Sequence, residues 1–267
     1  MHEDLALRGI HYVRRRALDW VAEVGRLALL VRDTLRFLGP GIRSFGLVVD
    51  QMYSVGVESL WLVFVVSIFT GAVAAVQAAY QFSSVVPLKY IGSVILRSVV
   101  IELGPVLTAL VVGGRVGASI AAEIGTMKVT EQIDALTAMA INPVRYLVVP
   151  RVIAALVMLP VLTILADGVG VFGGYIVSIT SIGVSSHTYI TALKQFFYYK
   201  DLFSGLLKAF IFGGIIAWMG CYYGFQTEGG AEGVGRATTQ AVVSSCVLVL
   251  ISDYVLANVL FRFIFAS

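Results

Sequence analysis

Long stretches without a charged side chain are the feature that most limits how this chain can fold. No Asp, Glu, Lys or Arg occurs from Ser59 to Leu88, and from Val152 to Leu193 the only one is Asp167. A helix needs about 20 mostly apolar residues to cross the hydrocarbon core of a membrane, whereas a strand of a membrane barrel needs only about 10 residues of alternating polarity. These stretches therefore predict an all-α polytopic membrane protein.

The composition supports this fold class. Charged residues make up 13 % of the 267 residues, whereas a soluble globular protein has roughly 25 %. The net charge of +3 is too small to indicate a nucleic-acid partner. Five spanning helices are predicted, and they cover Leu60–Gln77, Ile91–Ala118, a long segment that starts at Val152 and bends at Pro160, Leu202–Phe225, and Ala237–Leu260.

Residues 1–50 differ from the rest of the chain. Eight arginines and six acidic residues stand among apolar residues spaced three and four apart, which is the pattern of an amphipathic helix. We predict an interfacial helix lying along the membrane surface; a helix that packs on a partner is the alternative. The chain thus divides into an N-terminal amphipathic segment, 1–50, and a transmembrane domain, 51–267.

The distribution of Lys and Arg predicts the orientation, because these residues accumulate in cytoplasmic loops. Thirteen lie on the side of the N-terminus, eight of them within residues 1–50 and the others being Arg115, Lys128, Arg145, Arg151 and Arg236. Five lie on the other side, namely Lys89, Arg97, Lys194, Lys200 and Arg262. The N-terminus is therefore predicted in the cytoplasm, and five spans place the C-terminus outside.

The loop between the second and third spans carries a charged amphipathic segment at about 128–141. Val129, Ile133, Leu136 and Ala140 share one helical face, while Thr130, Glu131, Asp134 and Thr137 lie on the other side. Asn142-Pro143 is a plausible stop, because the residue before a proline is disfavoured in the α region. A soluble motor domain could grip this helix, or the helix could simply seal the bundle; spacing alone favours neither.

Ionisable residues within predicted spans are costly and usually face the bundle interior or a cavity. Arg97 and Glu102, five residues apart, could pair loosely or meet a lipid headgroup, and a purely structural contact is equally possible. Asp167 and Asp253 are further interior polar groups. These four residues would also form the relay of a self-sufficient secondary transporter or channel, which is the rival hypothesis.

Catalytic chemistry finds little support in the sequence. Gly168-x-Gly170-x-x-Gly173 lies inside an apolar run, so it predicts close helix packing, together with Gly170-x-x-x-Gly174 and Gly113-x-x-x-Gly117. Gly230-x-x-x-x-Gly235-Arg lacks the lysine of a phosphate-binding loop. His2, His11 and His187 are scattered, with no metal-ligand spacing. We expect no catalytic residue, no metal site and no ATP site, and therefore a membrane subunit that is not an enzyme.

Several motifs resemble one known family. They are Glu102-Leu-Gly-Pro-Val-Leu-Thr-Ala-Leu, the long run Gly114-Arg-Val-Gly-Ala-Ser-Ile-Ala-Ala-Glu-Ile-Gly-Thr-Met-Lys-Val-Thr-Glu-Gln-Ile-Asp-Ala-Leu, Asn142-Pro-Val-Arg-Tyr-Leu-Val-Val-Pro-Arg, and Gly233-Val-Gly-Arg-Ala-Thr-Thr-Gln. Over about residues 55–265 the chain resembles the MlaE (YrbE) family, whose members are permeases of ABC transporters associated with MCE proteins.

The resemblance implies a homodimer in the bacterial inner membrane, with a periplasmic C-terminus. Two cytoplasmic ATPase subunits would hold ATP and magnesium, so this chain itself needs no cofactor, and a periplasmic MCE oligomer would receive or deliver the lipid. The substrate would be a phospholipid or a related lipid.

The resemblance also implies roles for residues. Lipid would bind at Gln77, Tyr80, Arg97 and Glu102, of which Glu102 and Gln77 match residues of the family. The segment 128–141 would be a coupling helix, with ATPase contacts at Glu123, Lys128, Glu131 and Asp134. One departure is Ile101, because some family members have a basic residue directly before the glutamate.

Overall fold

The computed structural model describes residues 21–39, 45–82 and 87–262, and these residues form helices joined by short turns, with no strand among them. A helix covers 21–39. The others are α2 Phe45–Gly56, α3 Leu60–Phe82, α4 Ile91–Ser98, α5 Gly104–Val112, α6 Ala118–Val129, α7 Gln132–Ala138, α8 Val149–Thr180, α9 Ser186–Gln195, α10 Tyr199–Phe225 and α11 Gly230–Leu260. The short segments η1 Val57–Ser59 and η2 Leu88–Tyr90 are 3₁₀ turns, and η3 Val99–Leu103, η4 Gly113–Gly117 and η5 Val144–Val148 are π-helical.

Five helical stretches of the described chain are long and apolar enough to cross a membrane, as the sequence predicted. They are Phe45–Gln81, Ile91–Val129, Val144–Thr180, Tyr199–Phe225 and Gly230–Leu260. The first begins before the predicted Leu60 because α2 runs through η1 into α3. The predicted division between residues 50 and 51 therefore falls inside α2. The third continues through Pro160 as one helix.

Glycines allow α3 and α8 to pack backbone against backbone. A Cβ atom on Gly71 would lie 1.7 Å from the carbonyl oxygen of Gly170, and one on Gly173 would lie 2.2 Å from that of Ile68. A side chain at either position would push the helices apart. The predicted role of the Gly170-x-x-x-Gly174 pair in close packing is confirmed, since Gly174 also faces the Gly71 carbonyl oxygen, at 3.2 Å from its ideal Cβ.

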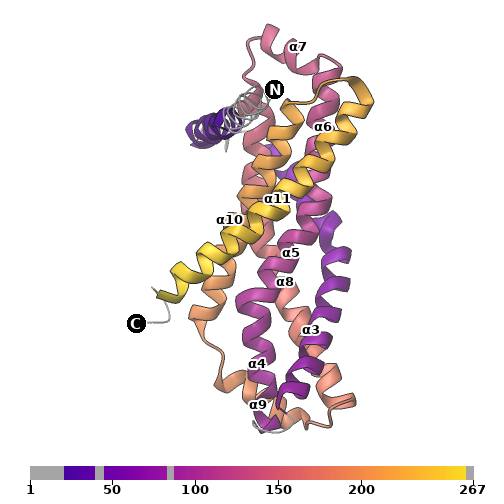
Figure 1. Ribbon diagram of the computed structural model, residues 1–267, viewed down its shortest axis with the longest axis vertical. Helices are drawn as coiled ribbons and strands as arrows, with labels where there is room; N and C mark the ends of the chain where they lie inside the picture. The colour runs from indigo at the N-terminus through magenta and orange to yellow at the C-terminus, as the bar shows by residue number, and fades with distance from the viewer. Residues whose placement is uncertain (1–20, 40–44, 83–86, 263–267) are drawn as a thin grey trace, which may run out of the picture.

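The two ends of the bundle differ (Figure 1). The short helix α7 lies at one end, and α9 lies with the start of α4 at the other, while α11 slants across the bundle. The helix at 21–39 lies toward the α7 end, where the Tyr222 hydroxyl donates a hydrogen bond to the Glu23 carbonyl at 3.3 Å.

Most of that helix is solvent-accessible in the isolated chain. Its exposed residues include the apolar side chains of Val21, Val24, Leu29 and Leu35. Apolar side chains of this kind are what an interfacial helix buries in the membrane. The remainder of the predicted amphipathic segment, residues 1–20 and 40–44, lies outside the described residues.

Candidate functional site

A buried lysine joins three spans at the depth of the bilayer. Lys208 of α10 has 1 % of its side chain exposed, and its ammonium lies 2.7 Å from Glu102 Oε2 and 2.9 Å from Asp253 Oδ1. Glu102 belongs to η3 and Asp253 to α11. A cation in this position is stable only beside counter-charges, and the two carboxylates supply them. The Glu102 side chain remains 44 % exposed.

Arg97 does not pair with Glu102, contrary to one of the interpretations above. Its Nε donates to Asp201 Oδ2 at 3.0 Å, and its guanidinium carbon lies 5.9 Å from the centre of the Tyr198 ring. Arg97 and Glu102 are thus both paired to residues of α10. Five residues separate Arg97 and Glu102, so they point away from one another, and each finds its partner on the neighbouring helix.

Sequence reasoning missed Lys208 and Asp201 as members of these pairs. The signal was present in part, because Lys208 interrupts an apolar run and an intramembrane lysine requires an acidic partner. Asp253 was noted as an interior polar group, and its pairing with Lys208 supports that interpretation.

A largely apolar groove of about 560 Å³ lies between α3 and α5. Its lining comprises Val65, Val66, Phe69, Thr70, Val73, Ala74, Gln77, Leu103 and Leu107. Gln77 lines this groove as a polar group among apolar residues. Leu103, the chain neighbour of Glu102, also lines it. Tyr80 is 85 % exposed near the end of α3 and does not line the groove.

Asp167 is buried where α8 meets the second span. Neither of its carboxylate oxygens has a hydrogen-bond partner among the described residues. A Cβ on Gly104 would lie 1.8 Å from Asp167 Oδ1. The glycine of the Glu102-Leu-Gly104-Pro motif thus leaves room for this carboxyl group, which is a local reason for glycine at that position.

The predicted coupling helix is shorter than 128–141. Helix α6 continues to Val129, so Lys128 belongs to it, and α7 covers only Gln132–Ala138. Glu131 and Ala140 adopt left-handed backbone conformations, each with φ 59°, and these positions end the helical path on both sides of α7.

The amphipathic pattern of α7 itself is confirmed at two positions. Ile133 is buried and Leu136 packs against the core, whereas Asp134 has 64 % of its side chain exposed. Val129 and Ala140 are exposed, contrary to the predicted apolar face, because both lie beyond α7. Exposed Met139, missed by the sequence reasoning, follows α7 directly. The surface presented at this end is therefore mixed, with acidic and apolar side chains side by side.

The predicted ATPase-coupling residues separate into two groups. Lys128 and Asp134 form an ion pair at 3.3 Å, and Glu131 is exposed beside them. Glu123 instead accepts a hydrogen bond from Ser119 at 3.2 Å and pairs with Arg151 at 2.8 Å. Arg151 is buried in the first turns of α8, so Glu123 ties α6 to α8.

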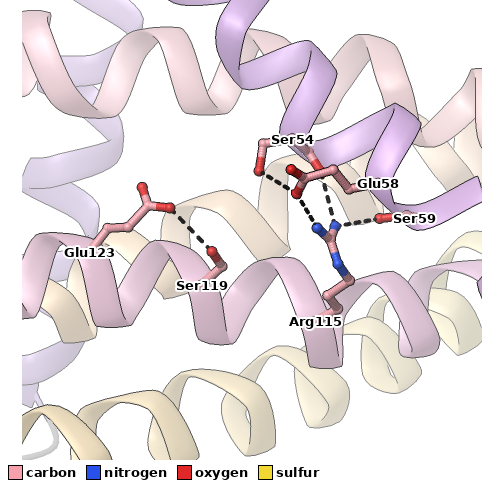
Figure 2. A network of polar contacts seen from close by, with 6 residues as sticks. All are labelled: Ser54, Glu58, Ser59, Arg115, Ser119 and Glu123. Atoms are coloured by element: carbon pink, nitrogen blue, oxygen red, sulfur yellow. Dashed lines mark hydrogen bonds and ion pairs between the residues drawn. The ribbon is translucent and has the colours of Figure 1, made fainter.

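Arg115 makes a second connection on the same helix (Figure 2). Its guanidinium donates to the Ser54 carbonyl and to the Ser59 hydroxyl, both at 2.9 Å, and pairs with Glu58. Glu58 and Ser59 belong to the 3₁₀ turn η1, and Ser54 lies in the last turn of α2, just before it. The π-helical segment η4 carries Arg115 toward this turn, and π segments often occur at functional positions in helices.

Five apolar helices of spanning length, with ion pairs between them, define a multi-pass membrane protein. The chain belongs to the MlaE permease family, whose model matches residues 48–259. It is 48 % identical over 250 residues to a probable ABC transporter permease of Rickettsia typhi, covering 94 % of this chain and 96 % of that protein. It is therefore of the ABC transporter permease class.

Two more distant relatives carry more specific names. An intermembrane phospholipid transport system permease of Haemophilus influenzae is 33 % identical over 250 residues, covering 92 % of this chain and 95 % of that protein. A chloroplastic protein of Arabidopsis thaliana named trigalactosyldiacylglycerol 1 is 37 % identical over 213 residues, covering 80 % of this chain and 61 % of that protein. Both names refer to lipids.

Proposed function

We propose that this chain is the permease subunit that moves a phospholipid or related lipid between the inner membrane and a periplasmic MCE assembly. ATP hydrolysis would take place in separate ATPase subunits, and this chain would contribute no catalytic residue, metal or cofactor. The observation that carries the proposal is the groove between α3 and α5, which is lined by Gln77 and by Leu103, the chain neighbour of Glu102. The relative named for intermembrane phospholipid transport supports the substrate class.

The groove suits an amphipathic ligand. Its apolar walls would stabilise acyl chains, while Gln77 and Glu102 would receive polar atoms of the headgroup. Because Lys208 already faces Glu102, the carboxylate is held in place and its exposed half remains available. Arg97 is half-exposed beside Asp201 and would add a second polar contact. Tyr80 lies farther along α3 and would act at the mouth of the path, where its ring is accessible.

A second copy of the chain would complete the site. A half-exposed carboxylate within a span is costly if it faces hydrocarbon. We therefore expect the exposed part of the Glu102 side chain to face a cavity or a protein partner. In a homodimer the two Glu102 residues would line a shared cavity, and the cost of exposing charge to lipid would be avoided.

Coupling to the ATPases would use the α7 end. Exposed Glu131, Asp134 and Met139 would contact the ATPase, while Ile133 and Leu136 anchor α7 to the bundle. Glu123 and Arg151 would then transmit displacement from α6 to α8. ATP shifts a conformational equilibrium only when it binds the two conformations with different affinity. Because ATP would bind the ATPase and not this chain, a mechanical link is needed to carry the change into the permease. In this arrangement the N-terminus and α7 are cytoplasmic, and α9 and the C-terminus are periplasmic.

The proposal is tested by ATP-dependent lipid transfer in proteoliposomes that contain the chain together with its ATPase. We expect Glu102→Ala to reduce transfer of a fluorescent phospholipid by about tenfold or more, equivalent to one charge-assisted hydrogen bond. Glu232→Ala serves as the control, because Glu232 is an exposed acid paired only with Arg236 one helical turn away.

Transfer that proceeds without ATPase or ATP, and that responds to an ion gradient, would contradict the proposal. It would favour the self-sufficient transporter, with Glu102, Asp167 and Asp253 as relay groups. If Glu102→Ala and Glu232→Ala transferred lipid equally well, Glu102 would not lie on the lipid path. The ATP dependence of transfer by the wild-type protein would then decide separately whether transport is coupled to the ATPase.

A further inference from the structure

A polar pocket at the α9 end of the molecule has no role in the transport scheme above. Its volume is about 380 Å³, which lies within the range of small-ligand sites. It is lined by Lys89 and Tyr90 of η2, and by His187, Thr188, Thr191, Ala192, Gln195 and Phe196. Apart from Phe196, which follows α9 directly, the last group belongs to α9. The pocket is distinct from the groove between α3 and α5, with which it shares no residue.

The wall of this pocket is held firmly by the fold. Gly92 lets α9 approach the first turn of α4, since a Cβ there would lie 2.8 Å from the Tyr189 carbonyl oxygen. The Tyr189 side chain is fully buried, and its hydroxyl donates to the Val171 carbonyl at 3.1 Å. Burial raises the pKa of Tyr189 well above its usual value because the phenolate would be desolvated. The phenol therefore remains a donor, and α9 stays anchored to α8.

Positive charge predominates around the pocket. No Asp or Glu occurs between Glu58 and Glu102 in the sequence, or between Asp167 and Asp201, and none lines the pocket. Lys89 lines the pocket, whereas Lys194 belongs to α9 without lining it. The Lys89 ammonium lies 4.9 Å from the centre of the Tyr90 ring. That ring meets Phe196 edge-on with centroids 5.9 Å apart, so the ammonium has a defined place at the pocket.

The lining groups favour an anion rich in acceptor oxygens. The Lys89 ammonium, two threonine hydroxyls, the Gln195 amide and the His187 imidazole can all donate hydrogen bonds, and phosphate offers only strong acceptors. Exposed Tyr198, Tyr199 and Phe203 follow directly in the chain, and such aromatic residues concentrate at the headgroup level of a membrane. This position favours a lipid over a soluble partner.

We propose that this pocket binds the phosphate group of a phospholipid headgroup, in the leaflet on the α9 side of the bundle. Binding here does not require the proposed transport activity, and it is measured on this chain alone. Failure of one proposal would therefore leave the other standing.

The test is a titration of the full-length purified protein by native mass spectrometry in detergent. The probes are phosphatidylglycerol, the diacylglycerol with the same acyl chains, and inorganic phosphate as a competitor. The pocket variant is Lys89→Gln/His187→Gln. The matched control is Lys194→Gln, which removes one positive charge from α9 at a residue that does not line the pocket. Lys89→Arg, which keeps the charge, shows whether a loss of binding reflects charge or misfolding.

We expect the pocket variant to bind phosphatidylglycerol at least about tenfold more weakly than wild type, the loss expected for one charge-assisted hydrogen bond. Lys194→Gln and Lys89→Arg should bind as wild type does, diacylglycerol should bind more weakly than phosphatidylglycerol, and inorganic phosphate at equal concentration should not displace the lipid.

Three outcomes would overturn the proposal. Equal affinity in the pocket variant and Lys194→Gln would show that the lining groups do not bind the lipid. Displacement by equimolar inorganic phosphate would assign a free-phosphate site instead. Unchanged lipid binding, together with weaker co-purification of an acidic periplasmic partner by the pocket variant, would assign this face to protein docking.

Discussion

At the scale of single residues, Lys208 shows how this fold accommodates charge within a membrane. Its side chain is almost fully buried, and carboxylates from two other spans lie within 2.9 Å. Loss of one member of a buried ion group is more damaging than replacement of the group by apolar residues, because the remaining charge is left uncompensated. The cluster therefore fixes the positions of three helices relative to one another.

We predict that Lys208→Met lowers the free energy of unfolding by about 2–3 kcal/mol, below the full penalty for a buried pair because Glu102 is partly accessible. Unfolding in mixed detergent micelles, followed by circular dichroism, measures this change. Lys208→Met/Asp253→Asn should recover part of the loss, since it removes one of the uncompensated carboxylates. Unaltered stability of the single variant would show that Glu102 and Asp253 need no counter-charge.

The sequence allowed the charged residues to be noticed but not paired. Glu102 and Asp253 stood out because each interrupts an apolar span. The partner of an intramembrane charge depends on which helices are neighbours and how they are rotated. Arg97 was therefore considered beside Glu102, five residues away, whereas both residues contact α10. Gln77, which lines the groove, was identified by family resemblance rather than by periodicity, and its lipid contact stays a prediction.

At the scale of helical elements, the contact between α3 and α8 depends on the absence of side chains. Gly71 and Gly170 meet where no Cβ fits, whereas Gly168, two residues from Gly170, has no atom within 4 Å of its ideal Cβ. Both are helical glycines in apolar segments. Alanine at Gly71 would therefore both replace a glycine and overpack the contact, whereas alanine at Gly168 would only replace a glycine.

We predict that Gly71→Ala destabilises the protein by about 1–3 kcal/mol, the usual cost of overpacking, while Gly168→Ala is neutral or slightly stabilising. Thermal unfolding of the two variants in the same detergent provides the comparison. Similar melting temperatures for both would mean that α3 and α8 separate easily, and would argue against a tight α3–α8 contact.

Arg115 offers a second test at this scale, because it holds the turn between α2 and α3 (Figure 2). A lysine cannot reproduce the planar fork in which Nη1 donates to Ser54 and Ser59 while Nη2 pairs with Glu58. We predict that Arg115→Lys increases amide hydrogen exchange in residues 54–60 by about tenfold, equivalent to one lost hydrogen bond to a charged group.

Hydrogen-exchange mass spectrometry of the intact protein measures this local effect. Arg236→Lys is the control, since Arg236 pairs only with exposed Glu232 within one helix. Exchange at 54–60 that matches wild type in Arg115→Lys would mean that the backbone bonds of η1 hold this turn without the guanidinium.

Element boundaries were predicted less well than element number. Apolar composition located all five spans, because lipid exposure demands it at every turn. It did not locate the helix ends, because helices continue past single charged residues, as α2 does at Asp50. Tertiary contacts determine the left-handed backbone of Glu131 and the π segments around Glu102 and Arg115, so the local sequence pattern gave no sign of them. Because the break at Glu131 was missed, α7 was predicted too long.

At the scale of the whole molecule, the two ends differ in character. The α7 end carries acidic Glu131 and Asp134 beside basic Lys128 and Arg145, together with exposed Met139, while the α9 end carries lysines and exposed aromatic residues. A protein that couples a soluble motor to a lipid path needs distinct surfaces at its two ends, one for protein docking and one suited to the membrane boundary. The described surface meets that requirement, with the mixed acidic and apolar face outside the spans.

The proposed coupling role of α7 is tested by Glu131→Ala/Asp134→Ala. We predict about a tenfold or larger loss of ATP-dependent lipid transfer, because two exposed contacts of about 0.7 kcal/mol each amount to one factor of ten. ATPase activity should become less dependent on the permease at the same time.

Glu232→Ala removes an exposed acid from the first turn of α11, and it should transfer lipid normally. The two replaced residues, Glu131 directly before α7 and Asp134 within it, are exposed, and the anchoring Ile133 and Leu136 are retained, so the bundle should remain folded. Transfer equal to that of Glu232→Ala would mean that α7 only seals the bundle, and the motor would then have to bind elsewhere on the permease.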